Sequence, residues 1–385
     1  MAALPPLSID MGLPALPLIE RNLPASAAGA ALTLSVFLAG FAVAQLLLGP
    51  LSDRIGRRPV LLGGLGLFTV AGIGCALAPS IGALLALRFV QGTGAAAGTV
   101  LAFAIVRDVF AGAAMRAKIA YVTMVLSVAP IIAPTLGGFL LPLGGWRAVY
   151  GVLALAGVAI LAAVVLGLEE TRAQQGSRGG WRGLLGGYGP VLRHRASTLY
   201  GWSNALNFGC LFAYVSGSPL LLMGSMGAST QLFGLLFAIT AGGIMLGAGL
   251  NGWLAQRGVP ARIPLAAGNY AIIAASVVLV ALAAAGHLTL PVMMPLLVVA
   301  IGARGLVSPS LFHAALEPLG QHAGAASAFL GFLQMGTGAA AAAIVAALYP
   351  VIGANGMFAP MLLFALASTA AWRVAVLSDP RLSDQ

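Results

Sequence analysis

Long apolar segments separated by short polar loops run along the whole chain. A membrane-spanning α-helix needs about 20 apolar residues to cross about 30 Å of hydrocarbon. The pattern predicts twelve such helices, at residues 2–19, 28–50, 59–78, 81–105, 118–141, 147–168, 198–222, 231–254, 263–285, 290–312, 323–347 and 356–376. A polar stretch at 169–197 separates residues 1–168 from residues 198–385. We therefore expect an all-α integral membrane protein with an N-terminal six-helix bundle, a central cytoplasmic loop and a C-terminal six-helix bundle.

The composition agrees with this membrane assignment. The 385 residues are 60% hydrophobic and only 7% charged, whereas soluble domains are about 25% charged. The net charge of +10 does not indicate nucleic acid, because about 15 of the 19 Lys and Arg residues fall in loops of one parity. Cationic loops stay in the cytoplasm, so this distribution predicts that both termini are cytoplasmic.

The most strongly charged loop, residues 49–58, lies between the second and third predicted helices. It holds Asp53 and the arginines Arg54, Arg57 and Arg58. Glycines flanking such a loop let two helix ends approach closely, and an aspartate there can pair with an arginine or face a helix N-terminus. A plain cationic anchor is the alternative. An anchor requires the arginines but neither the aspartate nor the glycines.

This loop resembles the segment between helices 2 and 3 of the major facilitator superfamily, which has the pattern G-x-L-a-D-R-x-G-R-[RK]-x-x-[LI]. The matching positions are Gly49, Leu51, Asp53, Arg54, Gly56, Arg57, Arg58 and Leu61. The resemblance implies two pseudo-symmetric bundles with a substrate site near the midplane between them. It also implies that the loop residues, with Asp53 and Arg57 at their centre, act as a conformational latch during alternating access.

Other segments are similar to one branch of that superfamily, the bicyclomycin/chloramphenicol-resistance (Bcr/CflA) drug:proton antiporters. The first helix, from Leu7 to Pro17, resembles the first helix of that branch, although its members have more residues before the acidic position. The resemblance implies either a short first helix here or a start further upstream. The fifth helix resembles the antiporter pattern G-P-x-x-G-G at Pro134, Gly137 and Gly138, preceded by Pro130, with Ala133 in place of the first glycine. Arg88 and Gln91 match the fourth helix of the superfamily, in which an arginine reaches into the membrane.

Asp10 is the main candidate for proton coupling. A charged residue within a spanning helix is costly, so we expect it to face a cavity and have a function. A low-dielectric site favours the neutral carboxylic acid, which allows proton uptake and release near neutral pH. Arg88 keeps its charge, so it would tune Asp10 or hold a relay water rather than carry the proton. The alternatives are a structural carboxylate at Asp10 and a structural hydrogen-bond hub at Arg88.

Several polar residues within predicted helices are candidates for substrate binding. They are Asp10, Gln91, Asn204, Asn207, Tyr214 and Gln334. For the polar residues of the C-terminal half, a buried and satisfied structural role is at least as plausible. Pro130, Pro134, Gly137 and Gly138 would bend the fifth helix and pack it closely against the other half, which would limit leak. A kink without a role in coupling is the alternative.

No arrangement of catalytic or metal-ligating residues is visible. Cys75 and Cys210 lie in apolar segments and read as packing residues, and no Cys, His and acidic cluster has ligand spacing. We expect a monomeric antiporter, not an enzyme, in the bacterial inner membrane. It would exchange protons for small hydrophobic or amphipathic drug-like compounds, with the proton gradient as energy source and no cofactor, metal or nucleic acid. The alternatives are an exporter or importer of a metabolite and a non-transporting receptor, which would be expected to carry an added domain.

Overall fold

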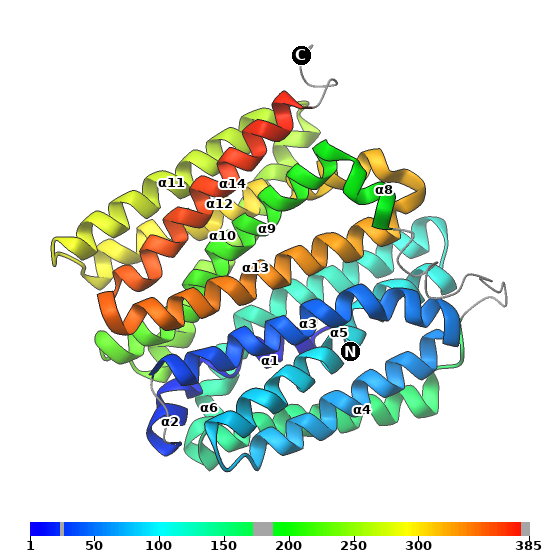
Figure 1. Ribbon diagram of the computed structural model, residues 1–385, viewed down its shortest axis with the longest axis horizontal. Helices are drawn as coiled ribbons and strands as arrows, with labels where there is room; N and C mark the ends of the chain where they lie inside the picture. The colour runs from blue at the N-terminus through cyan, green and yellow to red at the C-terminus, as the bar shows by residue number, and fades with distance from the viewer. Residues whose placement is uncertain (24–26, 172–187, 379–385) are drawn as a thin grey trace. The chain divides into compact units, whose positions relative to one another are not determined.

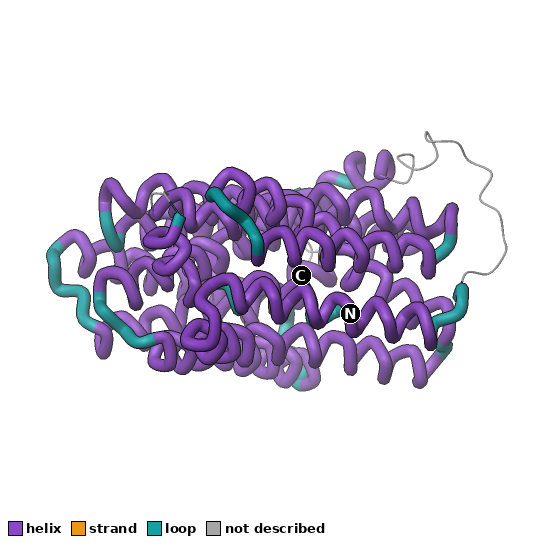
Figure 2. Tube along the Cα trace, turned by 90° about the horizontal axis from the view of Figure 1, so that it is seen from below, coloured by secondary structure: helices purple, strands orange, loops and turns teal. Residues whose placement is uncertain are grey.

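A computed structural model of the chain describes residues 1–23, 27–171 and 188–378. Every regular element in those ranges is helical, as the tube in Figure 2 shows. The chain divides into two compact units. One comprises Met1–Gly186 with Ala228–Gly234, and the other comprises Gly187–Gly227 with Leu235–Gln385.

The first unit is built around α5, which packs against both α3 and α4, while α4 also packs against α6 (Figure 1). The short helix α1 lies against α5 and α6. The elements of this unit, in chain order, are α1 (Leu4–Asp10), a 3₁₀ turn (Leu13–Ala15), α2 (Leu16–Asn22), α3 (Ala27–Ile55), α4 (Arg57–Ala76), α5 (Ile81–Val109) and α6 (Gly112–Gly167).

The second unit is built around α9, which packs against α12, α13 and α14. Tyr200 of α9 shares a buried apolar cluster with Leu311 of α12 and Trp372 of α14. The elements are α8 (Tyr188–Arg193), α9 (Arg195–Pro219), a π-helical turn (Leu220–Ser225), α10 (Thr230–Gln256), α11 (Arg262–Ala284), α12 (Leu290–Leu316), a 3₁₀ segment (Glu317–His322), α13 (Ala323–Ile352) and α14 (Asn355–Leu377). The first residues of α10 belong to the first unit.

Ten helices in the described part of the chain are long and apolar enough to cross a membrane. One of them, α6, has 56 residues and contains two crossings, because Gly144 and Gly145 have non-helical backbone angles in its interior. The broken first segment, α1 to α2, is the remaining crossing. The described ranges therefore hold twelve crossings, which confirms the expected all-α membrane fold.

The first crossing differs from the single helix expected at residues 2–19. It is broken immediately after Asp10, continues as a 3₁₀ turn that contains Pro14, and resumes as α2 with Pro17 in its first turn. Each proline lacks an amide hydrogen and clashes with the preceding turn, so the α-helix ends before it and restarts where proline is tolerated.

The central region also differs from the expectation of a loop over 169–197. Helix α8 and the first turn of α9 both lie inside that range. Residues 172–187 lie outside the described residues, so the predicted domain boundaries stay a prediction.

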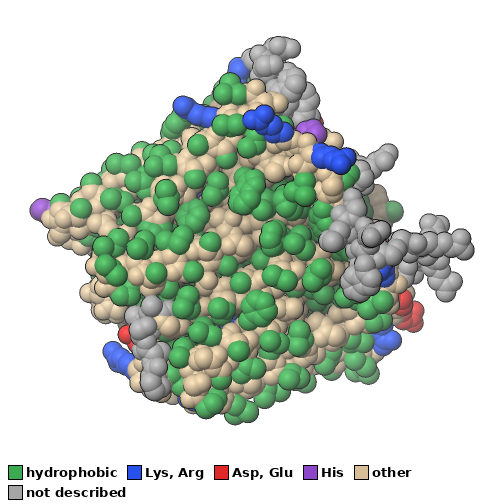
Figure 3. All heavy atoms as spheres, in the orientation of Figure 1, with side chains coloured by type: hydrophobic (Ala, Val, Ile, Leu, Met, Phe, Trp, Pro, Cys, Tyr) green, Lys and Arg blue, Asp and Glu red, His purple; other side chains and the backbone are tan. Residues whose placement is uncertain are grey.

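The surface of the protein is apolar over the helices. In Figure 3, hydrophobic side chains cover the face shown and charged side chains lie at its margins. Large apolar residues such as Leu143, Leu166 and Leu246 are more than three-quarters exposed. Patches of this extent are unfavourable in water, so these faces contact lipid.

Candidate functional site

Asp10 is the C-terminal residue of α1 and lies where the first crossing breaks. Its side chain is 5% exposed, and it forms no hydrogen bond or ion pair with another residue in the described ranges. The other described acidic residues lie near the ends of helices or beyond them. A buried carboxyl without a partner is costly as an anion, so the neutral acid is the less costly form at this position.

The helix-5 motif fixes the backbone beside Asp10. A Cβ on Gly137 of α6 would overlap the carbonyl oxygen of Met11, so only glycine permits this approach. A Cβ on the neighbouring Gly138 would lie 3.3 Å from the Cβ of Thr230, which belongs to the same unit. Pro134 is buried at the same level of α6. The motif thus holds the break in the first crossing from one side, a contact that the sequence did not predict.

Arg88 of α5 is buried and lies at the centre of a hydrogen-bond network. Its guanidinium donates to the carbonyl of Ser8 in α1 at 3.1 Å and to the carbonyl of Thr33 in α3 at 3.4 Å. It also donates to Oε1 of Gln91 at 2.8 Å. One of these acceptors is thus a backbone carbonyl of the first crossing. Arg88 forms no ion pair with Asp10 among the described contacts, so its charge is stabilised by neutral acceptors.

Aromatic rings complete the surroundings of Arg88. Its guanidinium carbon lies 4.3 Å from the ring centroid of Phe37 and 5.5 Å from that of Tyr150. Both distances fall in the range of cation–π attraction. A Cβ on Gly92, one turn along α5, would overlap the carbonyl oxygen of Phe37, which explains how α3 comes close enough for the stacking. Arg88 therefore joins α1, α3 and α5.

The candidate residues of the second unit have different surroundings. Asn204 accepts a hydrogen bond from Ser308 of α12 at 2.8 Å, but its Nδ2 has no partner. Both polar atoms of the Asn207 side chain are buried without a partner. The hydroxyl of Tyr214 lies 2.9 Å from that of Thr240 in α10, and Gln334 of α13 is partly buried. Tyr214 has the satisfied structural setting weighed for these residues, whereas Asn207 does not.

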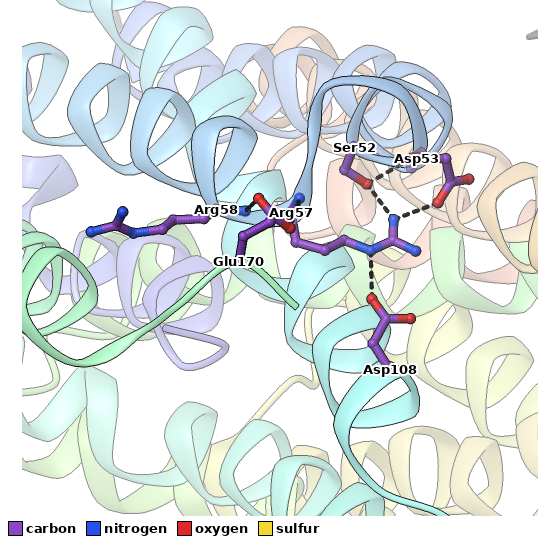
Figure 4. Close-up of polar contacts among 7 residues, drawn as sticks. Ser52, Asp53, Arg57, Arg58, Asp108 and Glu170 are labelled. Atoms are coloured by element: carbon purple, nitrogen blue, oxygen red, sulfur yellow. Dashed lines mark hydrogen bonds and ion pairs between the residues drawn. The ribbon is translucent and has the colours of Figure 1, made fainter. Parts of the chain in front are cut away.

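The charged loop forms a network around Arg57 (Figure 4). The Arg57 guanidinium lies 2.5 Å from Oδ1 of Asp53 and 2.8 Å from Oδ2 of Asp108, and it donates to Oγ of Ser52 at 2.6 Å. Arg57 is 14% exposed, so the network is partly shielded from solvent. The pairing of Asp53 with an arginine agrees with the expectation for this loop.

Glu170 caps the N-terminus of α4. Its carboxylate accepts hydrogen bonds from the backbone amides of Arg57 at 2.8 Å and Arg58 at 3.1 Å. First-turn amides have no acceptor within their own helix, and a negative charge is favoured at this end. Gly56 has a φ of 107°, which favours glycine, and a Cβ there would displace the Glu170 carboxylate. A Cβ on Gly49 would meet open space, so only the Gly49 carbonyl, which accepts from Ser52, has a role here.

Sequence reasoning missed several residues of this network. From the sequence, Asp108 reads only as a loop residue and Glu170 only as the start of the central segment. Their partners are 51 and 113 residues away, so no local spacing marks them. The sequence does give one indication of their role. Acidic residues are rare in this chain, and Asp108 and Glu170 each follow the end of a predicted helix.

Twelve membrane crossings in the described ranges, with a buried carboxyl and a buried arginine in the first unit, define a polytopic membrane transporter. The family model described as the Major Facilitator Superfamily matches residues 3–343, and the chain belongs to this family. Membership confirms the sequence-based expectation of a transporter and not an enzyme.

Named relatives support the branch assigned from sequence. The chain is 36% identical to the uncharacterized MFS-type transporter YdgK of Bacillus subtilis, over 87% of this chain and 84% of the relative. It is 39% identical to a chloramphenicol resistance protein of Pseudomonas aeruginosa, over 61% of this chain and 55% of the relative. It is 27% identical to a bicyclomycin resistance protein homolog of Haemophilus influenzae, over 90% and 87% of the two chains.

Solved structures confirm the fold. The xylose transporter XylE from E. coli superimposes with a TM-score of 0.72 at 13% identity, covering 97% of this chain and 94% of that one. The human organic anion transporter MFSD10 gives a TM-score of 0.65 at 21% identity, with 97% and 96% covered. Sequence identities this low support a shared fold and no further similarity.

Proposed function

We propose that this protein is a proton-coupled exporter of small hydrophobic or amphipathic compounds, including antibiotics, in the bacterial inner membrane. The observation that carries the proposal is Asp10, a buried carboxyl without a partner at a break in the first crossing. Relatives named for resistance to chloramphenicol and bicyclomycin support drug-like compounds as the substrates. The proton gradient is the energy source, and no cofactor takes part.

Asp10 carries the proton and Arg88 positions the backbone around it. The neutral acid is stable in the buried site, whereas the anion needs a compensating group. Arg88 holds the carbonyl of Ser8, two residues before Asp10, and so fixes where α1 ends. A substrate that approaches the Asp10 anion replaces the proton, which gives exchange. Asp10 and Gln91 belong to this site in the first unit, and Asn204, Asn207, Tyr214 and Gln334 are the candidates in the second.

The Arg57 network and both termini lie in the cytoplasm in this proposal. Within the first unit, Arg54, Arg57, Arg58 and Arg107 lie at the end that carries Asp108 and Glu170. Arg147 binds the carbonyl of Ala78 at the opposite end of α4. The excess of cations at the first end supports a cytoplasmic location for it.

The Arg57 network acts as a latch that is closed in one conformation and released in another. Asp53 is 56% exposed, so its pairing with Arg57 can break without leaving a buried charge. Asp53→Asn removes one of the two acidic partners and is expected to slow transport while substrate affinity stays unchanged. A transport rate equal to that of the wild type would refute the latch.

Proton movement in everted membrane vesicles tests the proposed function. Vesicles energised by respiration acidify, and an exported drug that exchanges for protons lowers the pH gradient. We expect chloramphenicol, bicyclomycin or ethidium to lower it in the wild type and not in Asp10→Asn at equal membrane abundance. Retention of the response in Asp10→Asn would keep export and discard Asp10 as the proton carrier. No response to any of the drugs, with folded protein present, would favour a metabolite as substrate.

A further inference from the structure

Arg304 lies in the middle of α12 and has no charge partner among the described residues of its unit. The only acidic residue between positions 188 and 378 is Glu317, which follows the end of α12. Thirteen helical residues at 1.5 Å each place the two about 20 Å apart along the axis. Arg304 forms no hydrogen bond or ion pair with a residue in the described ranges, and its Nε is buried without an acceptor.

The side of α9 that faces Arg304 carries further unpartnered polar atoms. Ser308, one turn after Arg304, binds Asn204, and Arg304 itself stacks 4.9 Å from the ring centroid of Phe208, one turn after Asn204. Successive turns of α9 and α12 therefore contact one another along this side. Asn204 and Asn207 are each 1% exposed, and three of their side-chain polar atoms have no partner. Buried polar groups are normally paired, so this set is built to receive a group from outside the chain.

The chemistry of the set is dominated by hydrogen-bond donors. A guanidinium presents parallel N–H groups that match two oxygens on a planar centre, as in a carboxylate or a nitro group. The amides of Asn204 and Asn207 add donors. Phe208 and Phe212, with centroids 4.6 Å apart, add an apolar wall. A cation would be repelled by Arg304.

We propose that Arg304, Asn204 and Asn207, with Phe208 as the apolar wall, bind a planar two-oxygen acceptor group of the exported compound. The ligand class is an apolar or aromatic molecule that bears a carboxylate or a nitro group. The inference rests on the proposed function and specifies its substrates. With this site, the second unit recognises the substrate, and the first unit binds and releases the proton at Asp10.

Equilibrium binding to the purified full-length protein in detergent micelles tests this site. The probes are chloramphenicol, which carries an aromatic nitro group, and the analogue with hydrogen in place of that group. We expect the nitro compound to bind the wild type about tenfold more tightly, since a bond to a charged donor is lost in the analogue. Arg304→Gln should abolish the difference in affinity between the two probes. Arg304→Lys should keep part of it, because lysine keeps the positive charge but lacks the parallel N–H groups of the guanidinium.

Arg257→Gln is the matched control, since it removes an arginine that stacks on Trp253 in the same unit, at 3.9 Å from the ring centroid. It should keep the full preference for the nitro compound. Equal affinities of the wild type for the two probes would overturn the site. A preference that survives in Arg304→Gln, shown by thermal unfolding to be folded, would also overturn it.

Ethidium separates this inference from the export proposal, because it is a cation without acceptor oxygens. Export of ethidium with proton movement, together with no nitro preference, leaves the export proposal intact and refutes the Arg304 site. An Arg304-dependent nitro preference without proton movement by any probe supports the site and refutes proton-coupled export.

Discussion

Two arginines of this chain lie inside helices with the same place in their halves, yet their surroundings are opposite. Arg88 lies in α5 and Arg304 in α12, and each helix is the fourth crossing of its half. Both stack on a phenylalanine ring. Arg88 donates to three acceptors, whereas Arg304 donates to none in the described ranges. The same residue type is thus a structural hub in the first unit and an unpaired donor in the second.

This contrast extends to the neighbouring residues. In the first unit, Arg88 binds Oε1 of Gln91 and the carbonyl of Ser8, while Nε2 of Gln91 is buried without a partner, and Gly137 packs directly on the Met11 backbone. In the second unit, Asn207 keeps both polar atoms free of partners. Groups that are satisfied internally hold a structure, and groups that are left unsatisfied are available to a ligand. Buried polar groups in this protein therefore have two separate roles.

The largest expected effect comes from exchanging each arginine for leucine. Arg88→Leu removes the donor that joins the Ser8 and Thr33 carbonyls and Gln91, which should lower the stability of the protein by about 3 kcal/mol or more. Arg304→Leu removes an unpaired charge and should leave stability within about 1 kcal/mol of the wild type or raise it. Thermal unfolding of the purified proteins in one detergent measures both. Equal destabilisation by the two variants would show that Arg304 is as strongly held by its surroundings as Arg88.

A second test concerns the packing beside Asp10. Gly137→Ala places a methyl group on the Met11 carbonyl oxygen and should cost about 1–3 kcal/mol, with loss of drug-dependent proton movement. Gly151→Ala, in the same helix, meets open space and should change neither property. Unfolding curves of the two variants measure their stability, and vesicle assays measure drug-dependent proton movement. Wild-type behaviour of Gly137→Ala would show that α6 does not fix the break.

A smaller difference in stability is expected between substitutions of the two buried amides, Gln91 and Asn207. Gln91→Leu removes an acceptor of Arg88 and should destabilise the protein by about 1–3 kcal/mol. Asn207→Leu replaces an unsatisfied amide by an apolar group of similar size and should be neutral or stabilising, with weaker substrate binding. Denaturation and binding measurements on both variants sharpen the distinction. A strongly destabilised Asn207→Leu would place Asn207 among the structural residues.

The smallest effect is expected at the cap of α4. Glu170→Gln removes the negative charge at the helix N-terminus and should cost about 1 kcal/mol, with faster hydrogen exchange at the amides of Arg57 and Arg58. Glu169→Gln, the adjacent exposed acid, should leave both amides unchanged. Exchange followed by mass spectrometry distinguishes the two. Faster exchange in both variants would indicate a general charge effect rather than a cap.

Much of the fold was predictable because apolar length and loop charge are local properties. The spans, the tight charged loop and the buried place of Asp10 follow from these. The break after Asp10 differs from the single helix expected at residues 2–19, because the sequence does not show how much helix Pro14 and Pro17 remove. The partners of Arg57 and Arg88 depend on contacts 50 or more residues apart. Arg304 and Arg88 read alike as sequence, and only their packing distinguishes them.

The most direct test of the central claim, that Asp10 exchanges a proton for substrate, is proton release by purified protein. Chloramphenicol is added to the wild type, to Asp10→Asn and to Asp53→Asn in weakly buffered detergent solution with a pH-sensitive dye. We expect proton release on binding by the wild type and Asp53→Asn, and none by Asp10→Asn at saturating drug. Equal release by Asp10→Asn and the wild type would contradict it, because the proton would then come from another group.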